Sequence, residues 1–133
     1  MPAMAEEPIE LVRRFCSEWS TMDVDDFVSY FTDDAVYHNV PMEPCVGRDE
    51  IRTFAEEFIG SMQGLDVEIH HILADGPIVV TERTDVVVYP HVTIRVPIMG
   101  IFEIDDGKIA RWREYFDMKQ FEGVAAPGGS AGT

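Results

Sequence analysis

Apolar residues recur every three or four positions in three separate parts of the first half of the chain. Charged residues stand between them, so each part predicts an amphipathic helix with one buried face. The spacing predicts helices over residues 9–22, 23–31 and 51–62, with a turn at 32–34 after the second. A short extended segment at 35–40 then runs into a stretch rich in proline, where helix is disfavoured. Helices therefore precede any long strand.

From Leu65 onward the apolar pattern changes to a period of two, which is typical of strands with one buried face. Turn-forming residues at 75–77 and 105–108 separate the runs. The expected strands cover residues 65–71, 78–89, 92–102 and 109–118. This order predicts an α+β fold in which N-terminal helices pack into a strongly curved, mixed and mostly antiparallel sheet. Such a sheet can form a cone with a pocket between strands and helices.

Length and composition fit a single domain. The chain has 133 residues, of which 46% are hydrophobic, and this is enough to bury one core. We expect the domain to cover residues 1–122 and the segment 123–133, rich in Gly, Ala and Pro, to be a flexible tail. Cys16 and Cys45 lack the spacing of a zinc or redox motif, so they are interpreted as buried thiols. The four histidines show no metal-ligand spacing either, and no metal is expected.

The charge balance excludes some partners. The formal net charge is −15, and such a field repels nucleic-acid backbones and anionic lipid headgroups. No apolar run approaches the length of a membrane span, and the first residues lack the basic and apolar parts of a signal peptide. We therefore expect a cytoplasmic protein without nucleic-acid or membrane partners.

An arginine and an aspartate stand on the apolar strand predicted over residues 78–89. Because successive strand side chains point to opposite faces, Arg83 and Asp85 share the face of Val79 and Val87. Burying such a pair costs free energy unless both groups are held by hydrogen bonds. Taken alone, the two residues are explained by a structural ion pair more readily than by catalysis.

Three further polar residues are expected on the same inner side. Alternation along the last strand places Glu114 with Trp112 and Phe116, where burial raises the pKa of a carboxyl group. Tyr37 and Asn39 share a face by the same rule, and their phenol and amide can hold a water molecule. Two carboxyl groups and an arginine form an acid/base site that needs no metal.

The chain resembles the limonene epoxide hydrolase family in three segments. These are residues 36–41 with Tyr-x-Asn before a proline, 81–85 with Arg-x-Asp, and 107–117 with Trp-Arg-Glu-Tyr-Phe-Asp. Their order and separations match from the first helix to Phe121, and three motifs in register are more specific than any one of them. The resemblance implies a cone of the nuclear-transport-factor-like group, a homodimer, and hydrolysis of an epoxide to a vicinal diol without a cofactor.

The resemblance also implies a role for each polar residue. Tyr37 and Asn39 help to hold the attacking water, Asp85 protonates the epoxide oxygen, and Arg83 bridges the two carboxyl groups. The base that takes a proton from water is usually an aspartate in this family, and its position is Glu114 here. The longer side chain indicates either an adjusted site or a slower or different reaction, because a displacement of about 1 Å can cost roughly a hundredfold in rate.

An apolar pocket suits a terpene-like or cycloalkene oxide. The residues expected to line it are large and apolar: Phe27, Phe54, Phe58, Met62, Ile98, Met99 and Phe102. Two other functions stay open, an isomerase or cyclase of the same fold and a non-catalytic module that binds small molecules.

Overall fold

A computed structural model describes residues 6–122 and 124, and its helical segments come mainly before its long strands. Pro8 begins the first helix and Asp23 caps the second by accepting from the backbone N–H of Asp26. The helical segments are α1 (Pro8–Glu18), η1 (Trp19–Thr21), α2 (Val24–Ser29), α3 (Gly47–Ser61) and η2 (Met118–Phe121). Helix α2 lies within its predicted region, whereas α1 starts one residue before its region, at Pro8, and α3 starts four residues before its region, at Gly47.

Six strands form one mixed sheet in the order β2-β1-β6-β5-β4-β3. The pair β1 and β6 is parallel, and every other neighbouring pair is antiparallel. The strands are β1 (Phe31–Asn39), β2 (Cys45–Val46), β3 (Gly64–Asp75), β4 (Ile78–Tyr89), β5 (Val92–Asp105) and β6 (Lys108–Tyr115). The predicted α+β class and the mostly antiparallel sheet are confirmed.

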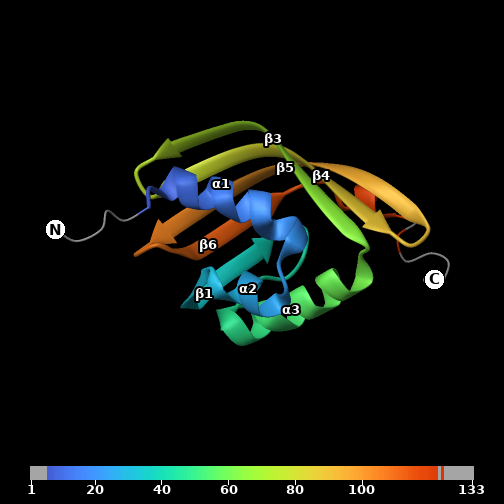
Figure 1. Ribbon diagram of the computed structural model, residues 1–133, viewed down its shortest axis with the longest axis horizontal. Helices are drawn as coiled ribbons and strands as arrows, with labels where there is room; N and C mark the ends of the chain where they lie inside the picture. The colour runs from blue at the N-terminus through green and yellow to red at the C-terminus, as the bar shows by residue number, and fades with distance from the viewer. Residues whose placement is uncertain (1–5, 123, 125–133) are drawn as a thin grey trace.

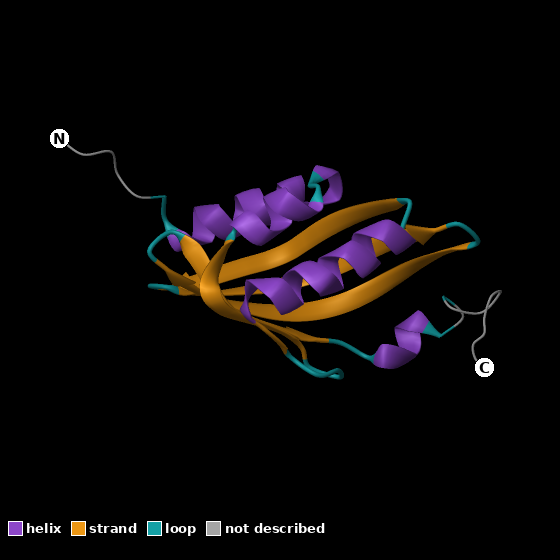
Figure 2. Ribbon diagram, turned by 90° about the horizontal axis from the view of Figure 1, so that it is seen from below, coloured by secondary structure: helices purple, strands orange, loops and turns teal. Residues whose placement is uncertain are grey.

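The helices occupy the inner side of the curved sheet (Figures 1 and 2). Helix α1 packs on β3 and β4, whereas α3 packs on β1 and β2. The core between these layers is rich in aromatic residues, with Phe15 and Trp112 in edge contact at 5.1 Å between ring centroids.

Other element boundaries also differ from the expectation, and two of them have a clear structural cause. The predicted turn at residues 32–34 is part of β1, which starts at Phe31, so the second helix stops earlier than expected. Phe31 pairs with Ile109, and Arg48 donates to the Phe31 carbonyl, so tertiary contacts hold an extended backbone that local sequence marks as a turn. The last strand stops at Tyr115 rather than at residue 118, because Asp117 caps a short 3-10 helix.

No helix within residues 6–122 is long and apolar enough to cross a bilayer. The predicted flexible tail at residues 123–133 lies, apart from Val124, outside the described part of the chain.

Candidate active site

Arg83 reaches across a neighbouring strand to join two carboxyl groups. Strand β4 carries Arg83 and Asp85 on its inner face, and Glu114 stands on the inner face of β6. Strand β5 lies between β4 and β6 in the sheet, so β4 and β6 are about 10 Å apart. The arginine side chain spans this gap. All three side chains are almost fully buried, with Arg83 and Glu114 only 1% exposed.

All five N–H donors of the Arg83 guanidinium are used. Nε and Nη2 donate to the two oxygens of Asp85 at 3.1 and 2.9 Å. Nη2 and Nη1 donate to the two oxygens of Glu114 at 2.5 and 2.9 Å, and Nη1 also donates to the Thr81 hydroxyl at 3.1 Å. Burial opposes the charged form of Arg83, but the two carboxylates raise its pKa well above the usual value. The guanidinium is therefore a fixed positive charge between two acids.

Gly100 makes this bridge possible. It lies on β5 opposite Glu114 on one side and opposite Thr81 on the other. A Cβ atom at this position would overlap the Glu114 carboxylate and come within 2.7 Å of Arg83 Nη1. Because Gly100 has no side chain, the side chains of Arg83 and Glu114 can meet above its Cα atom.

Glu114 accepts a third hydrogen bond from its own strand. The indole Nε1 of Trp112 donates to Oε2 at 2.6 Å, so this oxygen has two donors while Oε1 has one. Burial raises the pKa of Glu114, and the donors from Arg83 and Trp112 oppose that shift. A carboxylate oxygen has two acceptor positions, so Oε1 keeps one for a further donor such as water.

Tyr37 and Asn39 join the site from the parallel strand β1. Asn39 is in register with Glu114, and Tyr37 is in register with Trp112. The Tyr37 ring stacks on Trp112 with centroids 4.3 Å apart, and its hydroxyl donates to Asn39 Oδ1 at 3.4 Å. Burial, with a smaller contribution from Glu114, raises the Tyr37 pKa well above its usual value, so the phenol keeps its proton. The five predicted polar residues are therefore gathered in one place.

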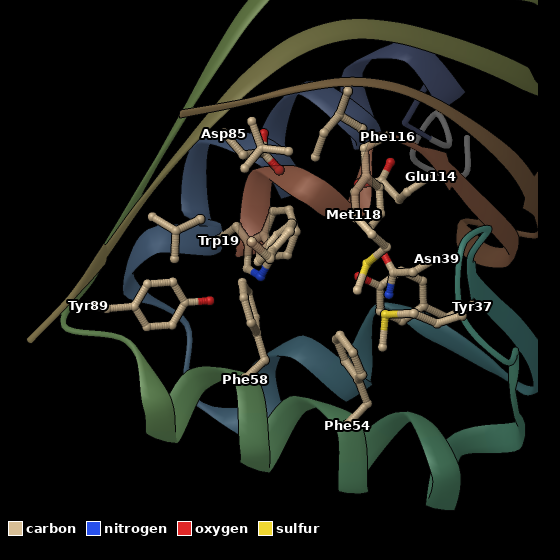
Figure 3. A pocket seen from close by; sticks show the side chains of 15 residues that line it. Trp19, Tyr37, Asn39, Phe54, Phe58, Asp85, Tyr89, Glu114, Phe116 and Met118 are labelled. Carbon is tan, nitrogen blue, oxygen red and sulfur yellow. The ribbon is translucent and has the colours of Figure 1, made fainter. Parts of the chain in front are cut away.

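A cavity of about 230 Å³ opens beside these groups (Figure 3). Asp85, Glu114, Tyr37 and Asn39 supply polar side chains to its wall. The rest of the wall is mainly apolar or aromatic: Trp19, Met42, Phe54, Phe58, Val87, Tyr89, Val96, Ile98, Phe116, Met118 and Phe121.

Three of the residues expected to line an apolar pocket, Phe54, Phe58 and Ile98, lie in this wall. The other four predicted residues lie outside this wall. Phe27 and Phe102 are packed in the core, and Met62 packs against it. Met99 follows Ile98 directly on β5, so it points to the opposite face and is 46% exposed.

Several wall residues and Gly100 were missed by sequence reasoning. Tyr89 continues the inward alternation of Asp85 and Val87 on β4, so the same rule that found Asp85 predicts it. Trp19 lies in a short 3-10 helix, and Met118 and Phe121 lie in η2, where alternation gives no guide. Gly100 carries no chemical signal, because its contribution is the absence of a side chain.

The described residues contain no group of three or more His, Cys, Asp or Glu side chains placed to hold a metal ion. Cys16 is a buried thiol whose pKa burial raises to about 12. Cys45 is partly buried.

The fold and site belong to a known class. Residues 12–112 match the SnoaL-like domain family, and the chain belongs to that family. The epoxide hydrolase EphG of Mycobacterium tuberculosis is 36% identical over 114 residues, which cover 85% of this chain and 76% of that protein. The expected kinship with limonene epoxide hydrolases is confirmed by this match and by a structural one.

Solved structures agree with the cone fold. An M. tuberculosis LEH-like epoxide hydrolase has a TM-score of 0.77 at 34% identity, covering 93% of this chain and 92% of its own. SalBIII, an epoxide hydrolase/cyclase-like enzyme of salinomycin pyran ring formation, has a TM-score of 0.75 at 21% identity, covering 85% and 92%. A Catenulispora acidiphila protein with a ketosteroid isomerase-like fold has the same TM-score at 17% identity, covering 88% and 90%. The last two likenesses show the fold alone.

Proposed function

We propose that this protein hydrolyses an apolar epoxide, terpene-like or derived from a cycloalkene, to a vicinal diol in one step. The observation that carries the proposal is the pair of buried carboxyl groups, Asp85 and Glu114, joined by Arg83 on the wall of an apolar cavity. Such a pair can place an acid and a base on the two sides of one reacting molecule. The 36% identity to an epoxide hydrolase supports the same reaction.

One proton shared by the two carboxyl groups gives them different roles. Two carboxylates and one guanidinium carry a net negative charge, and burial in an apolar site favours adding a proton to neutralise it. Glu114 accepts three hydrogen bonds from Arg83 and Trp112, whereas Asp85 accepts two. We assign the proton to Asp85 as the acid and leave Glu114 as the base, which are the roles that the family resemblance implies.

In the proposed reaction, Tyr37, Asn39 and Glu114 hold a water molecule. Glu114 takes a proton from the water as its oxygen bonds to one epoxide carbon. The bond from that carbon to the ring oxygen breaks, and Asp85 gives its proton to the oxygen. The product is a diol, and the shared proton has moved from Asp85 to Glu114. Attack from the side opposite the leaving oxygen inverts the carbon that is attacked.

The test is incubation with limonene oxide and cyclohexene oxide in oxygen-18 water, followed by mass spectrometry. We expect diol with one labelled oxygen, and we expect Asp85→Asn and Glu114→Gln each to lose most of this activity while remaining folded. Full activity in Glu114→Gln would contradict its role as the base. Saturable binding without turnover would favour a binding module, and rearranged, unlabelled product would favour an isomerase or cyclase.

The proposal includes a homodimer, as the family resemblance implies. Exposed apolar side chains on the outer sheet face support it, since Met99 and Tyr115 are neighbours across β5 and β6 and are both nearly half exposed. Light scattering coupled to size exclusion would give twice the monomer mass of 15.0 kDa. A mass of one chain at micromolar concentration would contradict this part of the proposal.

A further inference from the structure

The indole N–H of Trp19 is a buried donor without an acceptor. Trp19 is 4% exposed and forms part of the cavity wall. Within the described part of the chain, its Nε1 is the only buried side-chain nitrogen or oxygen that lacks a hydrogen-bond partner. Buried donors without an acceptor are rare in folded proteins, and each one calls for an explanation such as a role in binding. The indole of Trp112, by contrast, donates to Glu114.

The Tyr89 hydroxyl lies at the same end of the cavity. In Figure 3 it and the Trp19 nitrogen are directed toward the same space, across the cavity from Tyr37 and Asn39. The described residues give Tyr30 and Tyr37 hydroxyl partners but give the Tyr89 hydroxyl none. Burial raises the Tyr89 pKa, so this hydroxyl keeps its proton and can donate.

Two donors that face one space suit a single acceptor oxygen. A ketone, ester or ether oxygen has two lone pairs and can take a hydrogen bond from each group. Neighbouring wall residues such as Val87 and Phe58 are apolar and offer no competing acceptor. Because the Trp19 nitrogen is itself buried, the Phe58 ring, centred 6.2 Å from the indole, has to turn aside for the oxygen to reach it.

We propose that Trp19 and Tyr89 form a binding subsite for an acceptor oxygen of the substrate. This oxygen belongs to a group other than the epoxide ring and lies at a distance from it. The natural substrate is then an oxygenated epoxide rather than a pure hydrocarbon epoxide. The epoxide part of this statement rests on the proposed function, whereas the subsite itself does not. A site built to donate hydrogen bonds discriminates against an analogue without the acceptor, since its own polar groups then stay unpaired.

Two probes of nearly equal shape test the subsite in turnover. They are cyclohexene oxides with a 2-oxopropyl or an isobutyl group at carbon 4. The carbonyl oxygen of the first stands where the second has a methyl group. We expect kcat/KM to favour the ketone about tenfold, as one or two neutral hydrogen bonds allow. Tyr89→Phe should lower kcat/KM for the ketone about tenfold more than kcat/KM for the isobutyl compound, and so remove most of this preference. Equal rates for both probes in the unchanged protein would overturn the proposal.

Nuclear magnetic resonance tests the subsite without any reaction. The chain has two tryptophans, so its spectrum has two indole N–H signals, and that of Trp112 serves as the internal control. Addition of 1-cyclohexylpropan-2-one, which has the ketone but no epoxide, should shift the Trp19 signal downfield. The affinity should fall about tenfold in Tyr89→Phe.

The outcomes separate the two proposals. If neither epoxide is hydrolysed but the ketone shifts the Trp19 signal, the hydrolase function fails and the subsite stands. If both epoxides are hydrolysed equally and bound ketone leaves the Trp19 signal unmoved, the hydrolase function stands and the subsite is wrong.

Discussion

Two pairs of side chains that start from neighbouring residues of strand β4 differ in almost everything else. Glu82 points outward and meets His71 at 2.8 Å, with more than half of each side chain exposed. Arg83 points inward and meets Asp85 at 2.9 Å, with neither side chain more than 6% exposed. Exposed pairs are screened by water and contribute little to stability. The outer pair is a surface contact that the fold does not need.

The inner pair is costly to bury and therefore needs further hydrogen-bond partners. Desolvation of a guanidinium and a carboxylate is offset only when their remaining donors and acceptors are satisfied. Thr81 and Glu114 provide those partners from two strands, and Gly100 leaves the room for them. Neighbouring polar residues of one strand thus form a surface contact or part of a buried cluster, depending on the face of the strand on which they lie.

Loss of the central charge should have the largest effect. Arg83→Met keeps most of the side-chain volume but leaves Asp85 and Glu114 buried without a counter-charge. We expect it to abolish measurable diol formation and to lower the free energy of unfolding by about 3–5 kcal/mol. Urea unfolding at pH 7 measures the second quantity. Unchanged stability would mean that the pair is not buried in solution.

Gly100→Ala should have the next largest effect, through geometry alone. The added methyl would displace the Glu114 carboxylate by about 1 Å, so we expect roughly a hundredfold loss of kcat. Glu114→Asp by itself should retain or raise activity, because aspartate is usual at this position in the family. In that background the carboxylate is one methylene shorter, and Gly100→Ala should cost only about tenfold.

The control for simple damage to the fold is a comparison of four proteins: the unchanged protein, Gly100→Ala, Glu114→Asp and the double variant. An equal loss of kcat from Gly100→Ala in both backgrounds would show that Gly100 does not act through the glutamate. Inactive but folded Glu114→Asp would show that the site is built around the longer side chain.

The stability of the fold should depend on the protonation of Glu114. Burial raises its pKa above the ordinary value of 4.5, so the folded protein binds the proton more tightly than the unfolded chain does. Its contribution to stability is then complete below pH 4.5 and declines as the pH rises through the folded-state pKa. From pH 4.5 toward neutrality, the unchanged protein should therefore lose stability relative to Glu114→Gln, as measured by the free energy of unfolding of each. A difference independent of pH would refute the raised pKa.

Removal of the outer pair should have the smallest effect. Glu82→Gln keeps the shape of the side chain and should change the free energy of unfolding by no more than about 0.5 kcal/mol. Its kcat should equal that of the unchanged protein. A large loss of activity would mean that the outer face takes part in the reaction.

Alternation along strands was the most reliable guide in the sequence. It placed Arg83, Asp85 and Glu114 on one side because side-chain direction in a strand follows from position alone. Alternation also places Met99 on the outer face, where it is exposed, although its apolar character led us to expect it in the pocket.

Features that depend on contacts between distant segments were not predictable in this way. The start of β1 at Phe31 depends on pairing with Ile109, which the residues around Phe31 do not encode. The position of Trp19 in the cavity wall depends on a 3-10 helix between two α-helices. The bridge over Gly100 requires the strand order β6-β5-β4, and no local pattern specifies it.

A single-turnover reaction in oxygen-18 water tests the central claim most directly. With enzyme in excess over cyclohexene oxide, direct attack of water predicts one labelled oxygen in nearly all of the first diol formed, and unlabelled carboxyl groups in the protein. Unlabelled diol in the first turnover, with the label in Asp85 or Glu114, would show a covalent ester intermediate and contradict the one-step mechanism.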